Sequence, residues 1–225
     1  MALLFCRNHI SSIRITYLRA FGVCPSSCNN GNAVEKQKSE KPPRQRIHGD
    51  YILDVFKAIR SRRSIRAYSI DEVSDAEVES LLDAARWAPS AGNIQPWEFI
   101  IVGDAKTKRR LSAAALDQRF IEEAPLVIVV CADEHRSGSG YGGRGAHLYC
   151  LQDAAAATQN MLLAGCALRL GACWIGAFHE EKVEDIMKTP RGVRPVAIIP
   201  IGHPAEKPAA PPRRAIGKMV HHESF

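Results

Sequence analysis

Residues 88–97 read Ala-Pro-Ser-Ala-Gly-Asn-Ile-Gln-Pro-Trp, a stretch that combines turn-forming and polar residues. Its two prolines restrict the backbone, and its glycine permits another group to approach closely. Ser90, Asn93 and Gln95 add polar side chains. A carboxamide both donates and accepts hydrogen bonds, which suits the alternating edge of a heteroaromatic ring. The alternative interpretation is an ordinary loop rich in turn-forming residues.

A second stretch is strongly basic. Residues 55–70 hold five Lys and Arg side chains and no acid, and the sequence Arg62-Arg63-Ser64-Ile65-Arg66 follows a segment with helical spacing of apolar residues. Guanidinium groups and a hydroxyl are good donors to a phosphate, so this stretch is a candidate site for a phosphorylated cofactor. Taken alone, it fits better the solvated basic end of a helix, which the helix dipole favours.

The third stretch, residues 171–178, reads Gly-Ala-Cys-Trp-Ile-Gly-Ala-Phe. Its apolar residues indicate a buried strand over 172–178, and Gly176 lies where that strand would give way to a helix. Backbone N–H groups at such a point can face a ligand. The alternative is a buried strand with a glycine bend.

Apolar periodicity predicts the remaining elements. A first helix includes Ile52 and Val55, and a second follows the capping box of Ser74 and Glu77 and ends before Pro89. The glycine-rich residues 138–145 predict a mobile lid loop, with Tyr141 as a substrate contact. Further strands are expected at 97–102, 126–131 and 194–201, further helices at 105–116, 148–169 and 180–188, and an extended proline-rich arm from Pro204.

The net charge of +6 comes from the beginning of the chain. Residues 1–49 hold 8 Lys/Arg and 2 Asp/Glu, whereas residues 50–225 hold 22 of each, so the body is neutral. A broad polyanion-binding surface on the body is therefore not expected. No apolar run reaches the roughly 20 residues that span a bilayer, so no membrane segment is expected. The seven cysteines form neither a disulfide framework nor a metal-binding pattern, which favours reduced thiols.

Residues 1–49 are expected to be a basic, disordered leader or targeting segment before a domain over 50–225. Residues 1–34 contain three arginines and no acid, which is typical of a mitochondrial or plastid transit peptide. The same composition fits an extension or a start codon assigned too early. We expect a cytoplasmic protein, or an organellar one if this segment is a transit peptide. Salt-sensitive nucleic-acid binding through the leader is a separate hypothesis.

The three stretches, in this order, resemble the FMN-dependent nitroreductase family. The matching motifs are Arg-x-Ser-x-Arg after the first helix, Pro-Ser-x-x-Asn-x-Gln-Pro-Trp, and Gly-x-Cys-Trp-Ile-Gly-x-Phe. The resemblance covers roughly residues 50–214. It implies an α+β fold with a central mixed or antiparallel sheet flanked by helices, and a homodimer that exchanges the arm 204–225.

The resemblance also implies roles for individual residues. The FMN phosphate, ribityl chain and ring edge would be held by Arg62, Arg63, Ser64 and Arg66. The flavin would also be contacted by Ser90, Asn93 and Gln95 of the partner subunit, and near its N5 atom would lie Ile175 and Gly176, offering a backbone N–H. The phosphate would be closed over by a basic pair in the arm, Arg213 and Arg214.

The implied activity needs no catalytic acid or base from the protein, because the flavin carries the chemistry. NADH or NADPH would give hydride to flavin N5, and an electron-poor acceptor such as a nitroaromatic or quinone would take it in a ping-pong cycle. Alternatives within the superfamily are reductive dehalogenation and flavin fragmentation. Outside it, a flavin-binding or redox-sensing protein without turnover is the main alternative.

Overall fold

In the computed structural model, which describes residues 54–225, four strands form an antiparallel sheet in the order β1-β2-β4-β3. In the centre of the sheet, Val129 of β2 faces Ile100 of β1 on one side and Ile198 of β4 on the other. The strands predicted at 97–102, 126–131 and 194–201 are therefore confirmed. The bounds are β1 Trp97–Val102, β2 Leu126–Asp133, β3 Gly171–Ala172 and β4 Val193–Gly202.

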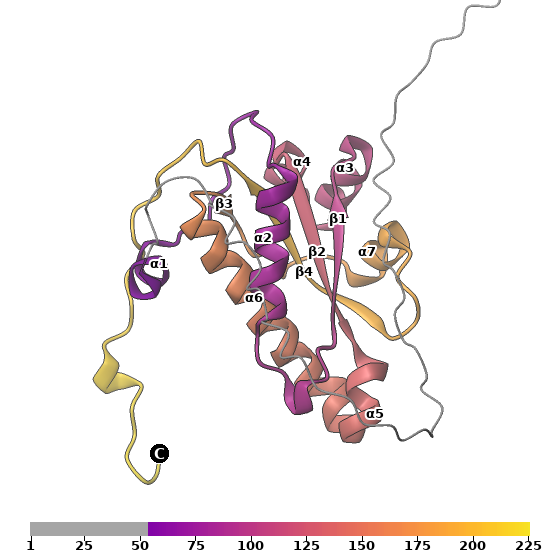
Figure 1. Ribbon diagram of the computed structural model, residues 1–225, viewed down its shortest axis with the longest axis vertical. Helices are drawn as coiled ribbons and strands as arrows, with labels where there is room; N and C mark the ends of the chain where they lie inside the picture. Colours follow the sequence, from indigo (N-terminus) through magenta and orange to yellow (C-terminus); the bar gives the residue numbers. More distant parts are fainter. Residues whose placement is uncertain (1–53) are drawn as a thin grey trace, which may run out of the picture. The chain divides into compact units, whose positions relative to one another are not determined.

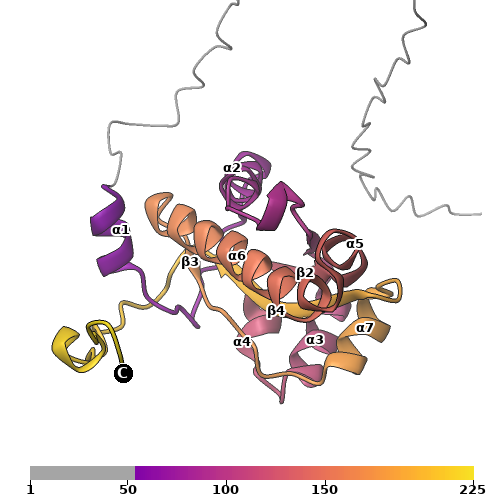
Figure 2. The ribbon, with the colours of Figure 1, turned by 90° about the horizontal axis from the view of Figure 1, so that it is seen from below.

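Both faces of the sheet are buried under helices. Alternate residues of β2 point to opposite sides, so Ile128 and Val130 join one hydrophobic cluster while Val127 and Val129 join the other. Figures 1 and 2 show helices lying over both faces of the sheet. The α+β class is thus confirmed. The first face carries α2 Asp75–Arg86 and α6 Cys150–Ala167, and the second α3 Ala105–Ala114, α4 Phe120–Glu123 and α7 Glu180–Met187.

Side-chain caps fix where the helices begin. The Ser74 hydroxyl accepts the N–H of Glu77 while the Glu77 carboxylate accepts the N–H of Ser74, which is the predicted capping box of α2. Asp104 accepts the N–H of Thr107 at 2.8 Å and caps α3. The helix predicted at 148–169 begins two residues later, at Cys150.

The prediction of a glycine-rich lid loop is wrong. Residues 134–149 form α5, Glu134–Arg144, followed by one π-turn, η2, Gly145–Tyr149. Asp133 caps α5, and the helix is kinked at Tyr141 and at Gly142, whose φ is 57°. The glycines here serve close packing as well as this turn: a Cβ on Gly145 would collide with the Ser137 carbonyl group.

The strand predicted at 172–178 is also shorter than expected. Residues 171–175 run beside β4 in one register, from Gly171 opposite Gly202 to Ile175 opposite Ile198. The ladder is interrupted at Cys173, whose partner in this register is Pro200. Proline has no N–H to donate, so only the Cys173 N–H bond to the Pro200 carbonyl is made. This irregularity confines the regular strand β3 to two residues.

The two ends of the described chain lie outside the sheet core. Helix α1, Val55–Ser61, buries only Ala58 and leaves Phe56 66% exposed. The residues from Pro204 run past α1 and contain only the short turn η3, Ile216–Lys218 (Figures 1 and 2). Ile52, the predicted leader and its proposed targeting role lie outside the described residues. The predicted domain boundary and the exchange of the arm stay predictions.

Candidate functional site

The basic stretch after α1 lies beside the third stretch. Ser64 forms a parallel bridge with Ala172, and the Ile65 N–H donates to the Ala172 carbonyl at 3.1 Å. The Cys173 thiol faces the same stretch: burial raises its pKa, while Arg66, a hydrogen bond with Ser64 and Arg62 act in the opposite direction. Two stretches more than 100 residues apart in sequence therefore form one cluster.

The arginines of this cluster are not equivalent. The Arg63 guanidinium donates to the carbonyls of Arg60 at 2.7 Å and Arg62 at 2.8 Å, at the end of α1. Within residues 54–225, neither Arg62 nor Arg66 has a carboxylate at ion-pair distance. Arg63 thus behaves as a helix cap, whereas the side chains of Arg62 and Arg66 form no ion pair within the described residues.

Glu206 is a residue of this cluster that the sequence interpretation missed. Its carboxylate accepts the backbone N–H groups of Arg66 at 2.5 Å and Ala67 at 3.2 Å. The Ala205 N–H donates to the Ala67 carbonyl at 2.9 Å. These bonds join the start of the arm to the basic stretch. A glutamate in a proline-rich segment gives no sequence signal for such a contact.

The third stretch presents a free backbone donor at Gly176. Ile175 exchanges both of its backbone hydrogen bonds with Ile198, so its N–H is used within the sheet. Gly176 is exposed, a Cβ added there would meet no atom within 4 Å, and its N–H has no partner among the described residues. The Gln118 carboxamide donates to the Ala177 carbonyl at 3.2 Å and holds the following residue. Of the two residues predicted near N5, Gly176 is the one that can donate.

An open hollow lies behind the basic stretch. Its volume is about 250 Å³, and it lies between α1, the end of α6 and the start of the arm. Arg62, Arg63, Arg169 and Lys207 line it together with one acid, Glu206, beside apolar groups of α6. Positive charge dominates this lining, which suits an anion.

The stretch 88–97 forms a rigid turn at the other side of the molecule, around η1, Ala91–Asn93. The Ser90 hydroxyl accepts the N–H of Gln95 at 3.0 Å, and the Gln95 carboxamide donates to both oxygens of Asn93 at 3.2 Å. Asn93 and Gln95 both have positive φ, 56° and 54°. The Asp153 carboxylate of α6 accepts the Ala91 N–H at 3.2 Å. The turn is therefore an ordered, polar structure.

Within one chain, the two halves of the predicted site lie at opposite edges of the sheet. Ser64 lies beyond β3, and residues 88–97 lead into β1 at the far edge. Four strand spacings of about 4.8 Å lie between Ser64 and Trp97, roughly 19 Å measured across the sheet alone. The structure places Arg62, Ser64, Arg66 and Gly176 along one edge of the sheet, but it does not bring Ser90, Asn93 or Gln95 to them.

Arg213 and Arg214 are also not in the cluster. Their hydrogen bonds are local, from Arg213 to the Pro212 carbonyl and from Arg214 to the Lys218 carbonyl. Both lie in the exposed arm. Their predicted role at a phosphate depends on how the arm lies in an assembly.

The cysteines, the possible metal ligands and the helices of residues 54–225 bear on three other kinds of site or segment. The four cysteines of this range are free, and no three His, Cys, Asp or Glu residues within it gather into a set that could hold a metal ion. None of the described helices combines the length and the apolar character needed to cross a membrane.

Comparison with known proteins identifies the family of the chain. A model of the nitroreductase family matches residues 59–118 and 112–203. An FMN reductase (NADPH) of Bacillus subtilis is 31% identical over 185 residues, covering 76% of this chain and 74% of the relative. An NADH dehydrogenase of Thermus thermophilus is 34% identical over 183 residues, covering 69% and 89%.

Solved structures show the same fold. The structure of B. megaterium NfrA2 has a TM-score of 0.71 and 30% identity, and the match covers 76% of this chain and 74% of that one. The predicted fold and the predicted class of oxidoreductase are confirmed, and FMN and NAD(P)H are the compounds that the relatives' names contain. With its fold, its ordered motifs and these matches in agreement, the chain belongs to the nitroreductase family.

Proposed function

We propose that this protein is an FMN-dependent oxidoreductase that passes hydride from NADH or NADPH to an electron-poor small molecule, such as a nitroaromatic or a quinone, in a ping-pong cycle. The observation that carries the proposal is the split site. Cationic and N–H donors lie at one edge of the sheet, and an ordered carboxamide turn lies at the other. In a dimer with a two-fold axis, the cationic edge of each subunit would meet the carboxamide turn of the other, and two identical sites would form.

The donors present fit FMN. Arg62, Ser64 and Arg66 would hold the phosphate and one edge of the ring, with Arg213 and Arg214 of the arm closing over the phosphate. The exposed Gly176 has room above it, and its N–H would donate near N5. When bound, FMN supplies the hydride chemistry, and the protein binds, orients and shields. Arg63 would act mainly through the end of α1.

The turn of residues 88–97 would come from the partner subunit, with Ser90, Asn93 and Gln95 toward the flavin. Exposed apolar side chains support such an interface, because Phe56 of α1 is 66% exposed and Trp87 is 74% exposed. Large apolar surfaces of this kind are typical of faces that pack against another chain. The arm from Pro204 would extend over the partner.

The first test is the visible spectrum of the purified protein, repeated without oxygen after NADH or NADPH is added. Two flavin bands that bleach, with FMN released on denaturation, are the expected result. Steady-state oxidation of NAD(P)H with a nitroaromatic or quinone then separates turnover from flavin binding alone. A protein that stays colourless after loading with FMN would overturn the proposal. Release of iodide from iodotyrosine, or breakdown of the flavin, would instead support the alternatives within the superfamily.

Subunit mixing tests the composite site directly. One copy carries Arg62→Ala with Arg66→Ala, the other carries Asn93→Ala, and different tags allow the mixed dimer to be isolated. Each variant alone should lose FMN from both of its sites. In the mixed dimer one site receives both defects and the other receives none, so one FMN per dimer should return. Sites built within single chains would leave the mixed dimer empty, which would refute the split site.

A further inference from the structure

Arg144 stands out because of its aromatic surroundings at the end of α5. Its Nε donates to the Tyr149 hydroxyl at 2.9 Å, and its guanidinium lies 5.3 Å from the centroid of the same ring. The rings of Tyr141 and Tyr149 meet edge to face, with centroids 5.3 Å apart. The guanidinium is thus held against a ring at the edge of a small aromatic cluster.

The charge of Arg144 is not compensated by the described chain. Within residues 54–225 no carboxylate lies at ion-pair distance from it, whereas Arg136 of the same helix pairs with Glu98 at 2.9 Å and with Asp133 at 3.4 Å. A guanidinium has five N–H donors, and the bond to Tyr149 uses the one on Nε. The two Nη groups therefore remain for a bidentate anion.

This aromatic cluster packs directly on the turn of residues 88–97. A Cβ added to Gly92 would lie 2.7 Å from the Tyr141 hydroxyl oxygen, and one added to Gly140 would lie 2.6 Å from Ile94. Tyr141 therefore lies against the residue that precedes Asn93, and it is 43% exposed. The kink at Gly142 and the π-turn that follows are what bring Arg144 and Tyr149 together.

We propose that Arg144, positioned by Tyr149, binds an anionic group, a carboxylate or a phosphate, on a planar substrate whose ring lies near Tyr141. The inference rests on the proposed function, because it assumes that residues 88–97 reach the flavin. The anion has two sources: a carboxylate on the electron acceptor, or the phosphates of the nicotinamide dinucleotide. Both substrates use the same place in a ping-pong cycle.

The test compares substrates that differ in charge and share the reacting ring. Acceptors are 4-nitrobenzoate and 4-nitrobenzamide, and donors are NADH and 1-benzyl-1,4-dihydronicotinamide, which has no phosphate. The FMN-loaded enzyme and its Arg144→Gln variant are compared by kcat/KM. In the variant, kcat/KM for the charged substrate divided by kcat/KM for the uncharged one should fall about ten-fold in at least one of the two pairs. The acceptor pair and the donor pair identify the source of the anion.

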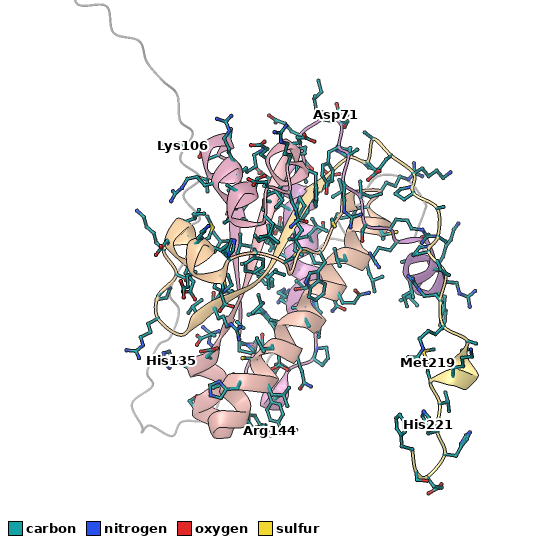
Figure 3. All side chains as sticks on the ribbon, turned by 180° about the vertical axis from the view of Figure 1, so that it is seen from behind. Asp71, Lys106, His135, Arg144, Met219 and His221 are labelled. Carbon is teal, nitrogen blue, oxygen red and sulfur yellow. The ribbon has the colours of Figure 1, made fainter. Side chains whose placement is uncertain are left out.

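Two further variants make the result specific. Lys106→Gln makes the same change of charge on α3, and Figure 3 shows Lys106 and Arg144 at opposite ends of the molecule. It should leave both ratios unchanged. Tyr149→Phe keeps the ring and removes the acceptor of the Arg144 Nε bond, so it should give a smaller fall than Arg144→Gln.

The outcomes separate this inference from the function on which it rests. One result is that the enzyme turns over its substrates while Arg144→Gln leaves the charged-to-uncharged ratio of kcat/KM unchanged in both pairs. That result would overturn the anion site but not the oxidoreductase activity. Equal losses for charged and uncharged substrates would do the same, because they would indicate a general defect. An unaltered, FMN-loaded protein that turns over none of the four pairings would overturn the proposed function and the anion site together.

Discussion

The Asp153 carboxylate accepts the backbone N–H of Ala91, with oxygen-to-nitrogen distances of 3.2 and 3.3 Å, and so ties the start of α6 to the turn before β1. Asp153 is only 8% exposed. Burial raises its pKa, and the bond from Ala91 acts against that rise. This contact holds the turn that the proposed function assigns to the partner's flavin.

Replacing Asp153 should separate the hydrogen bond from the charge. Asp153→Ala removes the acceptor of the part-buried Ala91 N–H and should lower the free energy of unfolding by about 1 kcal/mol. Asp153→Asn keeps an oxygen acceptor. A raised pKa means that the folded state favours the neutral carboxyl group, so the stability that Asp153 contributes is lost as pH rises from the ordinary pKa through the folded one. Asn carries no charge at pH 7, so Asp153→Asn should leave the free energy of unfolding at that pH undiminished. Urea unfolding measures both, and an equal loss in both variants would contradict this account.

Much of the sheet and its helices could be predicted from local pattern. The run at 126–131 and the capping box of Ser74 and Glu77 each carry their own signal, and both appear in the structure. The shortened β3 could not be predicted, because it depends on Pro200 lying opposite Cys173, and that register is set by the whole sheet. The glycines of α5 were interpreted as flexible, whereas Gly138 and Gly140 allow close packing.

The site was partly predictable for the same reason. Motif order identified Arg62, Ser64 and Gly176 as candidates, and the structure places all three at one edge. Asp153 had a usable signal, a lone acid among the small apolar residues of α6. Glu206 had none, because its role depends on where the arm returns to the chain. Long-range contacts of this kind carry no local signature.

Arg62 and Arg63 should respond differently to the same substitution. Arg62→Gln removes a positive charge that has no ion-pair partner within residues 54–225, and it should weaken FMN binding about ten-fold. Arg63→Gln removes donors to the last carbonyls of α1 and should lower stability by about 0.5–1 kcal/mol, with little effect on FMN. FMN fluorescence titration and thermal melts measure these effects on one pair of proteins. A larger loss of FMN affinity from Arg63→Gln would reverse the assignment.

Gly176 should tolerate a side chain but not the loss of its N–H. Since a Cβ there meets no atom within 4 Å, Gly176→Ala should fold and keep its flavin. Gly176→Pro removes the donor and should lower the midpoint potential of the bound flavin by up to roughly 30 mV, the equivalent of a ten-fold change for two electrons. Spectroelectrochemistry gives the potentials. If the alanine and proline variants share the potential of the unaltered protein, the Gly176 N–H does not act on the flavin.

Cys131 should make folding stability fall in alkali. It is fully buried between the sheet and the second helical layer, and burial, with Glu98 and Glu184, raises its pKa from 9.0 to about 12. The unfolded chain loses the thiol proton first, so the stabilisation is complete below pH 9 and is lost as pH rises through about 12. Over that window one such thiol contributes a slope of about 1.4 kcal/mol per pH unit.

Cys131→Ala should reduce the slope of unfolding free energy between pH 9 and pH 11 by up to that amount, whatever its cost at pH 7. The exposed Lys106→Gln variant is the control, and an unchanged slope in Cys131→Ala would show that this thiol does not ionise on unfolding as expected.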